Sequence, residues 1–530
     1  MHQFSSIKKE LLPWFEKMFK EEEDRQALIT RGYKSLKAAT YLLLQVNEGE
    51  KEVAKAYFNS LIPVITNSKK NDKQLNEDGD PMEAIHIAFT SSGLRRLGMR
   101  EEVLNTFSRE FIEGMTHTYK KDSKEIKERS ILLGDVGSND PDWWQWQNDE
   151  KKEHKEARVD VGLFFYAATN SKLEELIVKH YTKDTAGLKE VYEANTLQIS
   201  GKHNKEHFGF RDGISQPIIK GFSKSNIEQD KQKWINPGEF ILGHINEYDD
   251  YSPSPCVPLN AANSQELPSL NFDLCNMDLG KNGTYLVFRQ MEQHVERFLK
   301  YIYASSKEQA GTKMEKAVKL ASKMVGRWPE GQPLVTYPNG GCPMDRRSLN
   351  DFYYEDKDPN GVNCPIGAHI RRTNPRDQVH TGRDSAASME MSKKHRLLRR
   401  GRIYGTPVDP DFEIEKMIEK VKNTPDTPVT VGKITPNRGL HFIALVSDIG
   451  RQFEFVQSVW SNTAAFGHLC NEVDPVISPR PTADQPNCHE FTTPQETVRN
   501  RYIGVPMFTT VVGGAYFFLP GMNALRYILK

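Results

Sequence analysis

Strand-like segments that alternate with helix-like segments constrain the fold of this chain more than any other feature. Residues 38–46 form an almost unbroken apolar run, and a helix-like stretch follows at 53–61. Two further apolar runs, 62–66 and 84–90, are short enough to be strands. A strand, a helix and two more strands in this order predict an α+β sheet with helices packed on one face.

The same layout returns late in the chain. Residues 440–446 read as a strand, Ser447 and Asp448 can open a helix, and that helix is expected over 449–460. The chain has 530 residues, more than the roughly 250–300 at which a single core stops growing. The repeated unit and the length together predict two similar lobes.

The remaining segments are less regular. A charged helix is expected at 7–25, docked on the body of the protein. Three stretches rich in Ser, Pro and Asn, at 250–268, 424–436 and 478–494, read as long loops. Loops of this kind either frame a site or are surface insertions.

Composition excludes several classes of protein. The 71 Lys and Arg balance 71 Asp and Glu, so no charge excess favours nucleic acid or an anionic membrane. The sequence contains no run of about 18 apolar residues, which is the pattern that would predict a membrane-spanning helix. The six cysteines show no Cys-x-x-Cys spacing, and no secretory signal opens the chain. We expect a cytoplasmic protein without a disulfide framework.

Asp212 stands in His207 to Pro217, the first segment whose residues could take part in catalysis or binding. It lies between Gly209 and Gly213 in a Gly-x-x-Asp-Gly pattern, next to Arg211. Glycines here permit a backbone that other residues avoid, so the aspartate could be presented on a tight turn. An ordinary turn closed by an Asx hydrogen bond would give the same pattern.

His369 stands in the second segment, Cys364 to Arg376, which is rich in arginine. A third segment, Arg396 to Gly405, holds four more arginines. Taken singly, these are typical of a surface histidine and a solvated basic face.

Taken together, the three segments resemble the dye-decolorizing peroxidase family, in its larger bacterial and fungal branch. The resemblance extends from about residue 38 to residue 530. It is carried further by Ile87 to Thr90, Gly114-Met115, Leu133 to Asp135, Pro237 to Gly243, Asp278 to Gln290 and Gly513 to Pro520. Members of this family bind haem b.

The resemblance implies an α+β fold of two ferredoxin-like lobes, each an antiparallel sheet with flanking helices, in a barrel-like arrangement. It divides the chain into a helical segment (1–35), a first lobe that includes the Gly-x-x-Asp-Gly loop (36–220) and a second lobe with the haem-binding residues (221–530).

The resemblance also assigns roles. His369 matches the axial ligand of the haem iron, and a carboxylate on its other nitrogen would make it a stronger donor. Asp448 or Glu454 is expected to be that carboxylate. Asp212 matches the distal acid that moves a proton during peroxide cleavage, which implies a preference for acidic pH.

Arg399 matches the distal arginine, with Arg396 and Arg400 as adjacent alternatives. Arg371, Arg372 and Arg376 would pair either with haem propionates or with surface carboxylates. Four aromatic residues could relay electrons from bulky donors or could simply be packed in the core: Trp328, Tyr404, Trp460 and Tyr516.

The expected function is therefore a haem peroxidase that reduces hydrogen peroxide and oxidises dyes, phenols or similar donors through a ferryl intermediate. The alternative is a haem carrier or iron-release protein, which would need neither Asp212 nor Arg399. Expected partners are hydrogen peroxide and small electron donors, without nucleic acid or membrane, in a monomer or homodimer.

Overall fold

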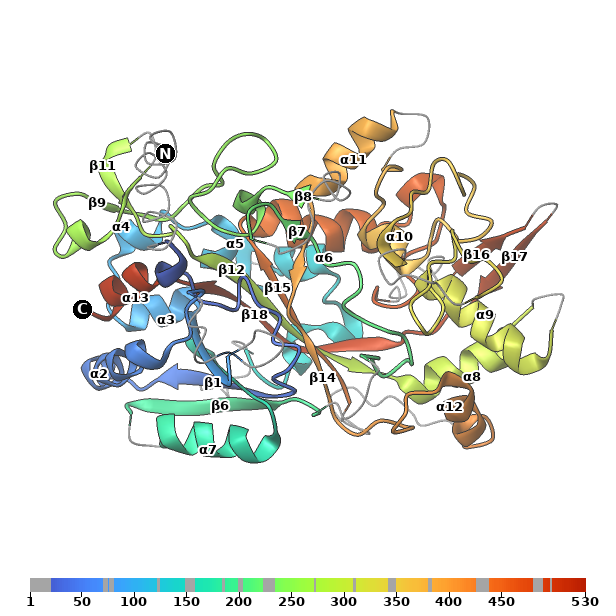
Figure 1. Ribbon diagram of the computed structural model, residues 1–530, viewed down its shortest axis with the longest axis horizontal. Helices are drawn as coiled ribbons and strands as arrows, with labels where there is room; N and C mark the ends of the chain where they lie inside the picture. Colours follow the sequence, from blue (N-terminus) through green and yellow to red (C-terminus); the bar gives the residue numbers. More distant parts are fainter. Residues whose placement is uncertain are drawn as a thin grey trace, which may run out of the picture.

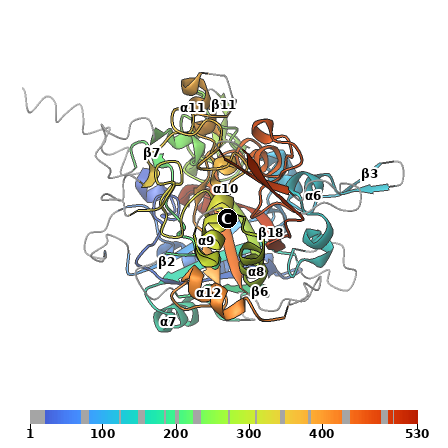
Figure 2. The same cartoon turned by 90° about the vertical axis from the view of Figure 1, so that its right-hand side faces the viewer.

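A computed structural model of the protein describes most of the chain (Figures 1 and 2). The described residues are 21–69, 75, 81–121, 124–147, 158–183, 186–198, 204–222, 234–270, 273–307, 311–341, 349–379, 384–425, 438–479, 490–495 and 498–530.

Nine strands of the described chain form one sheet through the middle of the molecule (Figure 1). Its order is β13-β15-β12-β18-β2-β5-β1-β6, with β14 also paired to β15, and the neighbouring strands are antiparallel. The strands are β1 (Ala38–Val46), β2 (Glu83–Phe89), β5 (Val161–Ala167), β6 (Leu188–Asn195), β12 (Thr284–Gln293), β13 (Leu398–Arg399), β14 (Arg402–Tyr404), β15 (Gly439–Val446) and β18 (Thr509–Leu519).

Helices and short strands surround this sheet. The helices are α2 (Lys51–Leu61), α3 (Ser91–Arg96), α4 (Glu101–Leu104), α5 (Arg109–Glu113), α6 (Glu128–Leu133), α7 (Asn170–His180), α8 (Val295–Ser305), α9 (Lys313–Val325), α10 (His369–Thr373), α11 (Ser385–Lys394), α12 (Ile414–Val421) and α13 (Met522–Leu529). Small two- and three-stranded sheets are made by β3 (Tyr119–Lys121), β4 (Lys124–Ile126), β7 (Ile218–Ile219), β8 (Trp234–Ile235), β9 (Cys256–Pro258), β10 (Ser269–Leu270), β11 (Asp273–Asp278), β16 (Glu490–Pro494) and β17 (Arg499–Ile503).

Both halves of the sheet have the same topology. In the first half the chain runs β1, α2, β2, β5, α7, β6, and the sheet order is β6-β1-β5-β2. In the second half it runs β12, helices α8 and α9, β13, β15, two π-helical segments and β18, with the order β18-β12-β15-β13. Each half therefore places its fourth strand beside its first and its third beside its second. The expected pair of ferredoxin-like lobes is confirmed.

The sheet curls until its outer strands meet. Tyr41 of β1 contacts Phe288 of β12 edge to face, with 5.8 Å between ring centroids, although the two strands are not neighbours. Beyond β6, the backbone N–H of Leu197 donates a 2.8 Å hydrogen bond to Ile403 O in β14. These contacts give the barrel-like arrangement.

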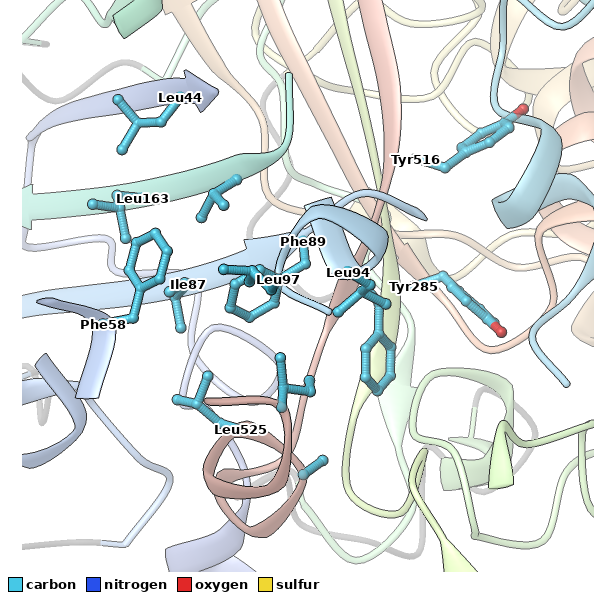
Figure 3. Close-up of a cluster of buried hydrophobic side chains, with 14 of the residues drawn as sticks. Leu44, Phe58, Ile87, Phe89, Leu94, Leu97, Leu163, Tyr285, Tyr516 and Leu525 are labelled. Carbon is cyan, nitrogen blue, oxygen red and sulfur yellow. The ribbon is translucent and has the colours of Figure 1, made fainter. Parts of the chain in front are cut away.

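Alternation along each strand divides the core into two parts. Leu42 and Leu44 of β1 point to the face that α2, α3, α7 and α13 cover, whereas Tyr41 and Leu43 point to the interior of the barrel. Figure 3 shows the helix-covered part, with Phe58 of α2 beside the sheet. Because both faces are covered there, β1, β5 and β18 are buried along their whole length.

The strands expected at 38–46, 84–90 and 440–446 are present, and the helix expected after Asp448 takes the form of two π-helical segments, Ile449–Glu454 and Val456–Ser461. The prediction of a strand at 62–66 is wrong. That segment begins with the 3-10 turn Ile62–Val64, where Pro63 fixes the backbone angle.

Other expectations fall partly outside the described residues. Most of the helix expected at 7–25 lies outside the described residues. The same holds for most of the loops expected at 424–436 and 478–494. The loop at 250–268 contains the short strand β9. Among the helices described, none has the length and apolar character needed to cross a membrane.

We expect Phe518→Ala to destabilise the protein by about 3–5 kcal/mol. Phe518 is fully buried, pairs with Phe89 where β18 of one lobe meets β2 of the other, and packs on Phe107. Urea unfolding followed by circular dichroism measures the change. Val178→Ala on the outer face of α7, where Val178 is 77% exposed, is the control and should shift the unfolding midpoint little. Equal midpoints for both variants would contradict the expectation.

Candidate active site

Helices α8, α9, α10 and α12 gather at one end of the second lobe (Figures 1 and 2). A cavity of about 260 Å³ lies in this lobe and is bordered by Val325 of α9 and by residues of α10. The sheet supplies one wall, through Arg289, Met291 and Gln293 of β12 and neighbouring residues of β15 and β18. Helix α10, the π-helical segments and the loop before β7 supply the others. Most of the lining surface is apolar, but polar side chains also border the cavity, including six arginines, Asp212 and His369.

His369 is the first residue of α10 and borders this cavity. Its Nδ1–H donates a 2.8 Å hydrogen bond to Oδ2 of Asp474, whose side chain is fully buried. Oδ1 of Asp474 accepts N–H bonds from Val476 and Ile477, which fix the carboxylate in turn. With Nδ1 occupied, Nε2 is the nitrogen left to bind a ligand.

Burial lowers the pKa of His369, but the charge of Asp474 and its hydrogen bond outweigh burial and raise the pKa above its usual value. The same pair works in the opposite sense on the carboxyl group. Burial raises the pKa of Asp474, and the charge of His369 and the hydrogen bond from its ring more than reverse this, so the net pKa is lowered. The two groups therefore stabilise each other's charged forms.

The predicted partnership of His369 with Asp448 or Glu454 is wrong. Asp448 caps the helix that follows β15, accepting from the N–H of Arg451. Glu454 points to the other side of that helix, where it binds Arg129 and the hydroxyl of Tyr516. Asp474 is 105 residues from His369 in sequence and stands in no local motif, so only the tertiary structure reveals it.

Asp212 and Arg399 border the same cavity, as the family resemblance implied. Nη1 of Arg399 lies 3.0 Å from Oδ1 of Asp212, across 187 residues of sequence. The N–H of Gly213 donates to the same oxygen at 2.6 Å, and Gly213 has a φ of +76°, which favours glycine. Within the described residues no other hydrogen bond reaches the side chain, so no protein donor there occupies Oδ2.

Three further arginines enclose the cavity without carboxylate partners among the described residues. Arg327 donates to the carbonyls of Gly331 and Leu349, and Arg376 to those of Asn350 and Phe352. Arg396 donates to Ser215 O.

These arginines are held in an unfavourable environment. Burial, followed by repulsion from Arg376, lowers the pKa of both Arg327 and Arg396 to about 9. An anionic ligand in the cavity would relieve this cost.

The other predicted arginines lie elsewhere. Arg371 does not border the cavity: it is buried against Asp358 and donates to Cys364 O, so neither the predicted propionate contact nor a surface salt bridge holds. Arg372 is buried as well and donates to backbone carbonyls. Arg400 donates to Leu28 O and Ile29 O, which leaves Arg399 and Arg396 as the cavity arginines of that run.

None of the four aromatic residues considered for electron relay borders the cavity. Tyr404, Trp460 and Tyr516 are buried, and Tyr404 stacks on His441 at 4.4 Å. Trp328 is half-buried and donates to Tyr337 O. Packing accounts for each of them, and a relay role stays a prediction.

Comparison with known proteins bears on the family. No family model matches the chain. Dye-decolorizing peroxidase msp1 of Mycetinis scorodonius is 26% identical over 462 residues, covering 85% of this chain and 77% of the relative. Multifunctional dye peroxidase DyP2 of an Amycolatopsis species is 29% identical over 398 residues, covering 73% and 74%.

Solved structures agree with these relatives in fold. An ancestral D-type dye-decolorizing peroxidase superposes with a TM-score of 0.72 at 23% identity, covering 96% of this chain and 99% of the other. The dye-decolorizing peroxidase of Auricularia auricula-judae gives 0.71 at 21% identity, with 96% and 100% covered. The chain is therefore similar to dye-decolorizing peroxidases along most of its length and shares their two-lobed fold.

Proposed function

We propose that this protein is a haem peroxidase that uses hydrogen peroxide to oxidise phenols and dyes. The observation that carries the proposal is the meeting of three elements in one cavity: His369 backed by Asp474, the Asp212–Arg399 pair, and arginines that have no carboxylate partner in the described part of the chain. Similarity to dye-decolorizing peroxidases over most of the chain supports the same activity.

The residues of the cavity fit a haem. His369 offers one imidazole nitrogen, and the described residues contain no cluster of three His, Cys, Asp or Glu side chains that could hold a bare metal ion. A porphyrin would supply the other ligands of the iron itself. Apolar walls suit the macrocycle, and Arg327, Arg376 and Arg396 suit its carboxylates.

We assign haem b, held without covalent attachment. The sequence has no Cys-x-x-Cys-His motif, and no cysteine borders the cavity in the described part of the chain. When bound, the haem supplies an iron centre that accepts two oxidising equivalents from peroxide and returns them one electron at a time.

Asp212 and Arg399 would carry the acid–base and electrostatic work of peroxide cleavage. Oδ2 of Asp212 takes the proton from one peroxide oxygen and gives it to the other, so that the second leaves as water. Arg399, held through its N–H by Gln216 Oε1 and through Nη1 by Asp212, stabilises negative charge that develops on the oxygens.

Phenols are the donor class that we propose first, because one member of the fold was solved as a complex with 2,6-dimethoxyphenol. A haem carrier or iron-release protein is the alternative function. A carrier has no use for a paired acid and guanidinium bordering the cavity, and this observation favours the enzyme.

We expect His369→Ala to lose haem, because no other imidazole borders the cavity in the described chain. The Soret absorbance of the purified protein, relative to its protein absorbance, measures loading. His180→Ala, at the end of α7 in the first lobe, is the control and should load normally. Normal loading of His369→Ala would defeat the assignment of the axial ligand.

Asp474→Asn should weaken haem binding by about 10- to 100-fold, because the outer partner of a ligating histidine fixes its orientation and its basicity. Titration of the apoprotein with haem gives the affinity. Asp448→Asn is the matched control, since Asp448 caps a helix and does not contact His369. If both variants bind haem equally well, Asp474 has no part in holding the ligand.

Asp212→Asn should slow the reaction with peroxide by about 10²- to 10⁴-fold, and Arg399→Leu by about 10²- to 10³-fold. Both should keep the Soret band. Stopped-flow mixing with peroxide gives the rates, and the exposed pair Asp411 and Lys416, changed in the same way, is the control. Fast turnover in Asp212→Asn would remove that residue from the mechanism, and a wild-type protein that does not react with peroxide would favour the carrier.

A further inference from the structure

The turn that presents Asp212 is closed by its own backbone. The N–H of Glu206 donates to Phe210 O at 2.9 Å, and the N–H of Asp212 donates to Asn204 O at 2.8 Å. Lys205 and Arg211 form an antiparallel bridge between these two bonds. Asp212 therefore sits at the end of a narrow hairpin, and its position depends on the shape of that hairpin.

Glu206 gathers three N–H donors around one carboxylate. Oε2 accepts from the backbone N–H of Phe208 at 3.0 Å and from Nε2 of Gln293 at 2.6 Å. Oε1 accepts from the backbone N–H of Phe210 at 3.0 Å. Two of the donors belong to the hairpin and the third belongs to β12, so the side chain ties the hairpin to the sheet.

The environment of the Glu206 carboxylate disfavours its charged form. Glu206 borders the cavity, and no ion pair to it exists among the described residues. Burial raises the pKa of Glu206 to about 7, against the lowering effect of its three N–H donors, and the nearby charge of Asp212 adds to the increase. Because no cation pairs with the Glu206 carboxylate among the described residues, its stabilising contacts are the three N–H donors.

Apolar packing holds the rest of the hairpin without help from Glu206. Phe208 and Phe210 are buried in the core around α8 and α9, and Phe208 packs on Phe298 with 4.6 Å between centroids. Gly209 takes a φ of +92° and lies against Phe412 O and Met417. The hairpin should therefore stay folded when the carboxylate is changed, which makes its local role testable.

We infer that Glu206 is a positioning residue for Asp212: its carboxylate fixes the hairpin to β12 through Gln293 and so sets where the Asp212 carboxylate lies in the cavity. The inference rests on the proposed function, because it concerns how well Asp212 is placed for proton transfer. Glu206 itself need not touch peroxide. Small displacements of a catalytic group are costly, since proton transfer requires hydrogen-bond distance.

Glu206→Gln is the main test. The amide turns an N–H₂ group toward N–H donors, so at least one of the three hydrogen bonds is lost. In the haem-loaded protein we expect an unchanged Soret band, a peroxide reaction slowed by at least about 10-fold, and faster hydrogen exchange in the peptide that spans 206–211. Glu206→Asp keeps a carboxylate and should recover part of the rate.

Glu292→Gln is the matched control. Glu292 is a buried glutamate beside Gln293 in β12, and burial raises its pKa to about 7, as for Glu206. Because side chains alternate along a strand, it faces away from the cavity. Its loss should leave both the peroxide rate and the exchange of 206–211 unchanged. Gln293→Leu, which removes one donor, should slow the reaction less than Glu206→Gln.

A double variant separates positioning from an independent effect. If Glu206 acts through Asp212, then Glu206→Gln adds no further loss to Asp212→Asn. A full, separate loss in the Asp212→Asn background would overturn the inference, as would unchanged exchange of 206–211 in Glu206→Gln. If Asp212→Asn is slow while Glu206→Gln reacts at the wild-type rate, the positioning role alone fails. If Asp212→Asn itself reacts normally, the proposed mechanism fails and the inference fails with it.

Discussion

Strand β12 is the element on which the remaining architecture depends. It is hydrogen-bonded along its length to β15 on one edge and β18 on the other. Leu286 and Phe288 point into the barrel, while Tyr285 and Val287 belong to the helix-covered core. Farther along, Arg289, Met291 and Gln293 border the cavity. A slip of one residue in register would turn these side chains to the opposite face and empty the site of its sheet-borne groups.

Charge in the second lobe is handled in two ways. The pair of His369 and Asp474 is satisfied within the protein, because each partner lies within hydrogen-bond distance and backbone N–H groups fix the carboxylate. Arg327 and Arg396, by contrast, have carbonyl oxygens as acceptors and remain short of negative charge. The His369–Asp474 pair orients the imidazole for a ligand. The buried arginines would be stabilised by the negative charges of a dianionic cofactor.

The sequence indicated the fold through long apolar runs, which became β1, β2 and β15 because both faces of the sheet are covered. The resemblance to dye-decolorizing peroxidases also grouped Asp212, Arg399 and His369 in one site, although each segment alone fits an ordinary turn or a surface patch. Asp474 was missed because it is an isolated aspartate whose importance depends on a contact across 105 residues. Arg371 was misplaced for a related reason: the pattern shows an arginine near His369 but not Asp358, which holds it away from the cavity.

The union of the lobes has a consequence for synthesis of the chain. The strands of the first lobe are all present once residue 195 has been made, yet β2 meets its second neighbour, β18, which begins at Thr509. More than half of the protein is translated while that edge of the sheet lacks its partner. Exposed strand edges promote pairing with other chains, so the nascent first lobe is the stage at which aggregation is most to be expected and at which a chaperone would be most useful.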